Sequence, residues 1–98
     1  MTKVQTKSGF VCEVDERKVA DWDFVCGLVD LEDENEAKRI KALKFDIEFL
    51  LGTKGAAALA EHVKDKNGIK SIATMLSEFK EIVELLGKES KKSSSSQE

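Results

Sequence analysis

The sequence predicts a mainly α-helical single domain of about four helices, with a possible short β-hairpin at its N-terminus. Of its 98 residues, 41% are hydrophobic and 36% are charged, which is a balance typical of globular proteins. From about residue 19 onward, apolar residues recur at three- and four-residue spacing, as they do in helices with one buried face. A chain of this length can bury one modest hydrophobic core.

The N-terminal segment, residues 4–14, has the pattern of a short hairpin. Val4 and Thr6 alternate with polar residues, and Ser8 and Gly9 form a turn-type pair. Residues 10–14, Phe-Val-Cys-Glu-Val, are rich in residues that favour strands. Because an isolated hairpin is only marginally stable, we expect this one to pack against the helices.

The first helix is expected over residues 19–31. Four apolar residues share one of its faces, which we expect to face the core: Trp22, Val25, Cys26 and Val29. Three further apolar residues lie on the opposite side: Phe24, Leu28 and Leu31. Residues 31–35, three of them acidic, are expected to connect this helix to the next.

Two more helices are expected on either side of Gly52, over residues 36–51 and 53–64. The first has a core stripe of five residues, Ile40, Leu43, Ile47, Leu50 and Leu51, and a second apolar pair, Phe45 and Phe49, on its other side. Gly52 suits a helix C-terminal cap. The helix that follows is rich in alanine, which favours helix formation and close packing.

The fourth helix has the clearest pattern. Ser71 is a suitable N-cap and Gly87 a suitable stop. Seven apolar residues between them form one stripe: Ile72, Met75, Leu76, Phe79, Ile82, Val83 and Leu86. Residues 88–98 contain no apolar residue and end in a serine-rich run, so we expect a helical domain over residues 1–87 and a disordered polar tail over residues 88–98.

The second apolar faces of the first two helices allow two interpretations. Such a helix either lies centrally in the core or presents one face to a partner protein. Under the second interpretation, the partner-binding residues are Phe24, Leu28, Leu31, Phe45 and Phe49. The same faces could also pair with one another, which predicts self-association.

The sequence offers no recognisable catalytic, metal or cofactor site. His62 is the single histidine, and no neighbour in the sequence suits it as a catalytic partner. Cys12 and Cys26 are expected to be small core residues with free thiols, and three scattered Cys and His residues do not match a zinc site. Residues 65–68, Asp-Lys-Asn-Gly, fit a turn and fail the spacing of a calcium loop. We therefore expect a protein that is not an enzyme and has no cofactor.

The charges are unevenly distributed along the chain. Residues 11–36 hold ten acidic and two basic residues, a net charge of −8, whereas the whole chain carries −3. This acidic segment is expected either to be a well-solvated surface or to attract a basic partner, and it argues against nucleic-acid binding. No segment reaches the ~20 apolar residues of a membrane-spanning helix, and the first residues lack the apolar run of a signal peptide, so we expect a cytoplasmic protein.

Several short motifs, in their order and spacing, resemble tail assembly chaperones of long-tailed phages and prophages of Gram-positive bacteria. These motifs are the run 8–16, the pair Asp21-Trp22, the acidic run 30–33, Phe49-Leu50-Leu51-Gly52, the turn 65–68 and the segment 78–84. The resemblance covers roughly residues 7–86.

The resemblance implies a non-enzymatic protein that binds the long, helical tape measure protein of the tail and keeps it soluble until the tail tube assembles. It also implies that the protein acts in the host bacterial cytoplasm and is absent from the mature virion. The residues by themselves leave an alternative open, a small cytoplasmic regulatory or adaptor protein that binds an amphipathic helix of a host complex.

Overall fold

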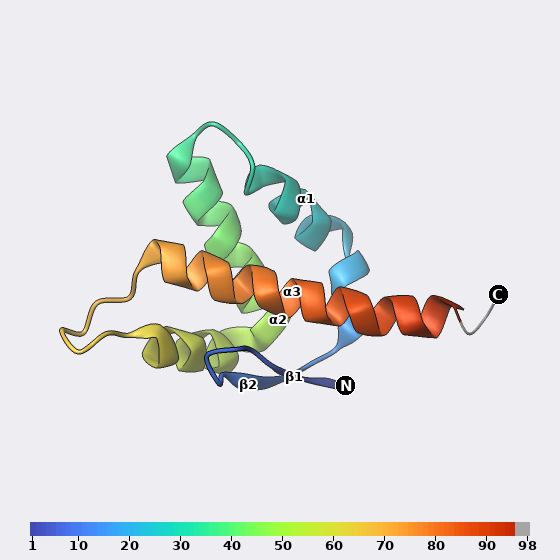
Figure 1. Cartoon of the computed structure of the whole chain (residues 1–98). Helices are drawn as coiled ribbons and strands as arrows, with labels where there is room; N and C mark the ends of the chain where they lie inside the picture. The colour runs from blue at the N-terminus through green and yellow to red at the C-terminus, as the bar shows by residue number, and fades with distance from the viewer. Residues whose placement is uncertain (96–98) are drawn as a thin grey trace.

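The structure is a computed structural model that describes the backbone of residues 1–95 and the side chains of residues 1–88. Two short strands, β1 (Thr2–Gln5) and β2 (Val11–Val14), precede a 3-10 helix, η1 (Glu16–Ala20). Three helices follow: α1 (Trp22–Asp30), α2 (Glu36–Val63) and α3 (Ile72–Ser95). Figure 1 shows α3 passing across the bent helix α2, with α1 beside the first part of α2 and the hairpin at the other end of the molecule. The mainly helical fold and the hairpin are thus confirmed.

The hairpin forms where the alternating pattern predicts it. β1 and β2 pair in antiparallel fashion, with Val4 opposite Cys12 and Gln5 opposite Val11. Gly9 in the connecting turn has a φ of 97°, which a residue with a side chain rarely adopts. Val4, Phe10 and Val14 are buried against the helices, so the sheet is stabilised by tertiary packing, as expected.

The helix expected over residues 19–31 begins later than predicted. Asp21 has an extended backbone, and its carboxylate accepts a hydrogen bond from the backbone N–H of Phe24 at 3.1 Å. Asp21 is therefore the N-cap of α1. Val19 and Ala20 belong to the preceding 3-10 helix, whose own cap is Asp15.

The prediction of which face of α1 points inward was wrong. Phe24 and Leu31 are buried, whereas Trp22 is 80% exposed and Val29 is 68% exposed. Both faces have helical apolar spacing, so periodicity alone could not decide between them. The inward face also contains Gly27, whose lack of a side chain lets α1 lie close to α2.

Three helices occur where four were expected, because residues 36–63 form one bent helix. Gly52 interrupts its regular backbone with φ 78° and ψ 168°, a combination that glycine adopts without steric cost. We refer to residues 36–51 as the first arm of α2 and to residues 53–63 as the second arm. The backbone leaves helical geometry at Gly52 alone, and the chain changes direction at this predicted glycine with no loop between the two arms.

Helix α3 extends beyond the stop predicted at Gly87. Gly87 does not adopt the positive φ of a glycine cap, and the helix continues to Ser95. The predicted disordered tail, residues 88–98, therefore coincides in part with helical backbone, and its last three residues lie outside the described part of the chain. That this polar segment is not needed for the fold stays a prediction.

The core lies where α1, both arms of α2 and α3 meet. Its fully buried side chains come from all three helices and from β2: Val14, Phe24, Leu50, Leu59, Phe79, Ile82 and Leu86. The rings of Phe24 and Phe79 meet edge to face with centroids 6.0 Å apart. The C-terminal part of the predicted α3 stripe is thus in the core, but Ile72 at its start is 57% exposed.

Candidate functional site

The five predicted partner-binding residues do not form one exposed surface. Phe24 and Leu31 are buried, at 0% and 8% exposure, and Leu28 and Phe49 are half-buried and pack on the core. Phe45 alone is largely exposed, at 47%. Phe24 and Leu31 therefore belong to the hydrophobic core in this structure.

Three of these residues instead form a row of aromatic rings that runs from the surface into the core. Phe45 stacks on Phe49 with centroids 6.0 Å apart, and Phe49 lies 6.0 Å from Phe24. The Lys18 ammonium lies 5.5 Å from the Phe49 ring centroid and donates to the Phe49 carbonyl at 3.1 Å. This row connects η1, α1 and α2, so its main role is packing.

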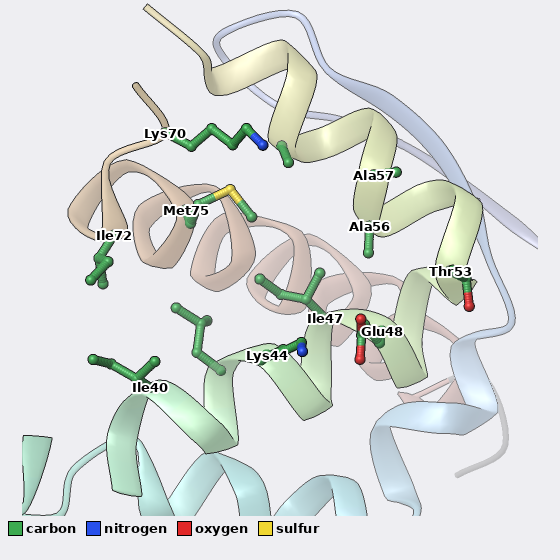
Figure 2. A pocket seen from close by; sticks show the side chains of 12 residues that line it. Ile40, Lys44, Ile47, Glu48, Thr53, Ala56, Ala57, Lys70, Ile72 and Met75 are labelled. Atoms are coloured by element: carbon green, nitrogen blue, oxygen red, sulfur yellow. The ribbon is translucent and has the colours of Figure 1, made fainter. Parts of the chain in front are cut away.

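A groove that the sequence reasoning missed opens between the two arms of α2 and the start of α3. It encloses a volume of about 400 Å³. Figure 2 shows Ile40 and Ile47 on the first arm, Ala56 on the second arm, and Met75 and Ile72 of α3 around this space. Three separate segments thus contribute apolar side chains to one concave surface.

The groove continues into a second hollow of about 330 Å³ toward the end of α1. The two hollows share Ile40, Leu43 and Ile72, and the second adds Leu31 and Leu76. We call the two hollows together the groove. Ile40 and Ile72 are 38% and 57% exposed, so apolar surface is accessible where the hollows join.

Small side chains and the bend of α2 explain why the groove is open. Gly52 turns the second arm away from the line of the first. The second arm then presents Ala56, Ala57 and Ala60, which are too short to fill the space opposite Ile47. Two features of the sequence could have indicated the groove. One is the alanine run after Gly52, and the other is the apolar stripe of α3, whose first residue, Ile72, lies outside the core.

The border of the groove is charged on several sides. Lys44 and Glu48 come from the first arm and Lys70 from the segment before α3. Arg39 has a structural role, since its guanidinium donates hydrogen bonds to the backbone carbonyls of Asp33 and Glu34 at 2.7 and 3.0 Å. The described lining is thus suited to binding an apolar segment, with a few charges available to orient it.

A polar cluster attaches the turn of the hairpin to α2 and α3. The buried Glu78 accepts hydrogen bonds from Thr6 at 2.8 Å and from Ser8 at 3.0 Å. The Ser8 hydroxyl also lies 2.9 Å from Nε2 of His62. His62 therefore has a partner that its sequence neighbours did not suggest. Glu78 accepts a hydrogen bond from Ser8 and makes none with His62, so it does not orient the imidazole as a catalytic carboxylate would. We therefore assign the cluster a structural role.

Asp46 is a buried carboxyl group between α1 and α2. It is 0% exposed, and neither carboxylate oxygen has a hydrogen-bond partner among the described residues. Burial, with a smaller contribution from the negative charge of Asp30, raises the pKa of Asp46 from 3.8 to about 7. The group is therefore largely protonated below neutral pH, which lowers the cost of burying it.

The two cysteines differ from the prediction that both belong to the core. Cys12 is half-buried, and burial raises the pKa of its thiol, whereas Cys26 is exposed on α1. Both thiols are free. Within the described residues, no three metal-ligating side chains lie close enough to hold an ion, and no helix there has the length and apolar character to span a membrane.

Comparison of the chain with protein-family models, curated proteins and solved structures finds no match.

Proposed function

We propose that this protein is a non-enzymatic assembly chaperone that holds an amphipathic helix of its client in the groove. Following the resemblance described above, the client is the tape measure protein of a phage tail, and the chaperone keeps it soluble in the host cytoplasm during tail assembly without entering the virion. The observation that carries the proposal is the open apolar groove formed by the two arms of α2 and the start of α3.

The shape of the groove suits a helical client. An amphipathic helix binds by placing side chains three and four residues apart into a hydrophobic groove. Here the joined hollows run from Thr53 and the alanines of the second arm to Leu31 at the end of α1. Ile40 and Ile72 at their junction lose exposed apolar area when such a helix binds, which favours association.

The charge distribution supports a role in solubilising an apolar client. Apolar residues dominate the lining of the groove, while residues 11–36, of which only Leu31 and Glu36 line it, carry a net charge of −8. When the client binds, its apolar stripe is buried in the groove, and the complex exposes the charged outer surface of the chaperone to solvent. Such a surface keeps complexes dispersed through mutual repulsion.

The test compares two isoleucines of nearly equal exposure. Ile72 lines the groove and is 57% exposed, whereas Ile69 is 60% exposed and is not among the residues that line it. Ile72→Asp and Ile69→Asp are each co-expressed with fragments of the long helical protein encoded in the same gene cluster. Circular dichroism confirms folding, and Ile72→Asp is expected to tolerate the charge because it begins α3, where the helix dipole favours an acid.

We expect Ile69→Asp to keep the fragment soluble and Ile72→Asp to lose this ability. Equal solubilisation by the two folded variants would show that the groove does not hold the client. If no fragment of the tape measure protein depends on the wild-type chain for solubility, the phage assignment is wrong. A groove-dependent complex with a bacterial protein would then identify the chain as an adaptor.

A further inference from the structure

Helix α1 presents an apolar face to solvent that the groove does not include. Trp22 is 80% exposed, Val29 68% and Val25 42%, and Cys26 between them is also exposed. Their spacing of three and four residues aligns them along one side of the helix. We call these four residues the outer face of α1.

The outer face is not required for the core. The opposite side of α1 supplies Phe24, Gly27 and Leu31, which are buried. A tryptophan exposed in this way, next to two exposed valines, is a contiguous apolar surface of the kind that marks interaction sites. Tryptophan is also among the residues that most often dominate binding energy.

The segment that carries the outer face is rich in acidic residues. Between residues 19 and 34 the chain has six acidic residues and no basic one: Asp21, Asp23, Asp30, Glu32, Asp33 and Glu34. Lys38 of α2 approaches Asp30 at 3.8 Å and Asp33 at 3.4 Å, and Lys41 lines one hollow with Asp23 and Asp30, so these two lysines offset part of this charge. Asp23 and Glu32 remain exposed, with no ion pair among the described residues. The outer face is therefore an apolar strip whose acidic border consists of neighbouring residues in its own segment, with Lys38 and Lys41 of α2 nearby.

We infer that the outer face of α1 binds a basic amphipathic helix of a partner protein. The apolar stripe of that helix packs along Trp22, Val25 and Val29, and its lysine or arginine side chains reach the acidic border. Charge complementarity of this kind raises the association rate and selects the partner.

The surfaces on the chain itself make a second copy the poorer occupant. Pairing two outer faces would bring two acidic borders together, which is electrostatically unfavourable. The groove is a different surface with residues of both charges at its border, Lys44, Glu48 and Lys70. The outer face and the groove are thus separate surfaces, and this inference does not depend on the function proposed for the groove.

Trp22 is the single tryptophan of the chain, so its fluorescence reports directly on the outer face. The probe is a synthetic amphipathic helix of about 18 residues, or five turns, with a leucine stripe flanked by lysines. The control peptide has the same leucines flanked by glutamates. Both are titrated into the full-length wild type, into Val29→Asp and into the groove variant Ile72→Asp.

We expect the lysine peptide to shift the Trp22 emission to shorter wavelength in a saturable manner, and the glutamate peptide to have no effect. Raising the ionic strength from about 0.05 to 0.5 M should weaken binding roughly tenfold, because the charged borders are exposed to screening. Val29→Asp should lose binding, whereas Ile72→Asp should retain it.

Three results would overturn the inference. Equal binding of the two peptides, or no binding of either, would show that the acidic border selects nothing. If Ile72→Asp loses binding and Val29→Asp retains it, the peptide binds in the groove and not on the outer face. A blue shift that grows with protein concentration without peptide, together with faster sedimentation, would make a second copy the occupant. Each result leaves the client test of Ile72→Asp against Ile69→Asp unaffected.

Discussion

The carboxyl group of Asp46 lies directly against the Cα of Gly27, so that α1 and α2 meet at the one residue of α1 that has no side chain. A Cβ atom at Gly27 would overlap both carboxylate oxygens and the carboxyl carbon of Asp46. This contact sets how closely α1 approaches α2 and thereby fixes Phe24 of α1 in the core.

We predict that Gly27→Ala destabilises the fold by about 1–3 kcal/mol, because the added methyl group overpacks the contact with Asp46. Gly87→Ala is the matched control, since it is also helical and its added methyl group would meet no atom within 4 Å. The control should stabilise the fold by up to about 1 kcal/mol. Urea titration measures both changes. Combining Gly27→Ala with Asp46→Ala should recover part of the loss, and strict additivity would mean that the two residues do not interact.

Because the pKa of Asp46 is raised in the folded state, we predict that the free energy of unfolding decreases as the pH increases. The folded state keeps the proton of Asp46 up to about pH 7, whereas the unfolded chain releases it near pH 3.8. Stability from this group is therefore fully present below pH 3.8 and is lost as the pH rises toward 7, by about 4 kcal/mol in total. Asp46→Asn has no proton to release, so its stability relative to wild type should rise over this range in urea titrations. A constant difference between the two proteins would show that Asp46 titrates normally.

The two faces of α1 should respond very differently to truncation. Phe24→Ala removes a fully buried ring that contacts Phe79 and Phe49, and should cost about 3–5 kcal/mol. Trp22→Ala removes a side chain that is 80% exposed and should change stability by less than about 0.5 kcal/mol. Thermal and urea unfolding of the two variants measures this contrast. A large cost for Trp22→Ala would mean that the face points inward, as its periodicity first suggested.

Glu78→Gln should loosen the hairpin while leaving the helices folded. The substitution keeps the size of the side chain but replaces one of the two oxygens that accept from Thr6 and Ser8. We expect a loss of about 1–3 kcal/mol, because a buried hydrogen-bonding group loses its partner. Hydrogen exchange should quicken at the strand amides of residues 2–14. The exposed Glu84→Gln is the control, and equal effects of the two changes would exclude a specific role for Glu78.

Removal of residues 88–98 should leave the melting temperature unchanged within error. This segment has no apolar residue to bury, so its helical backbone up to Ser95 adds little tertiary stabilisation. Calorimetry of the chain ending at Gly87 provides the measurement. A loss of several degrees would show that the polar end of α3 docks on the domain.

Local signals in the sequence predicted most of the elements. The Ser8-Gly9 turn, the change of direction at Gly52 and the buried Phe79 stripe each follow from preferences that act over a few residues. The same signals could not tell which side of α1 is buried. That outcome depends on the fit of Gly27 against Asp46, which is a contact between residues 19 positions apart.

The candidate site was harder to predict for the same reason. A groove has no residue pattern of its own, because it is the space left between elements once they are packed. Ile72 belongs to a regular stripe, yet it is exposed because the first turn of α3 lies outside the core. Conversely, Phe24 and Leu31 were candidate partner-binding residues and are part of the core.

Because α2 bends at Gly52, a small rotation there would move the whole second arm. Its residues 53–63 extend about 16 Å at 1.5 Å per residue, so a rotation of about 10° at Gly52 would displace the far end by about 3 Å. That displacement is comparable to the difference in reach between an alanine and a leucine side chain. Leu59, which is fully buried, and the hydrogen bond between His62 and Ser8 hold this arm at its present angle. The width of the groove is thus set by the backbone at Gly52 and by the contacts of Leu59 and His62. A substitution at Leu59 or His62 would therefore change the size of client that fits, without altering any residue that lines the groove.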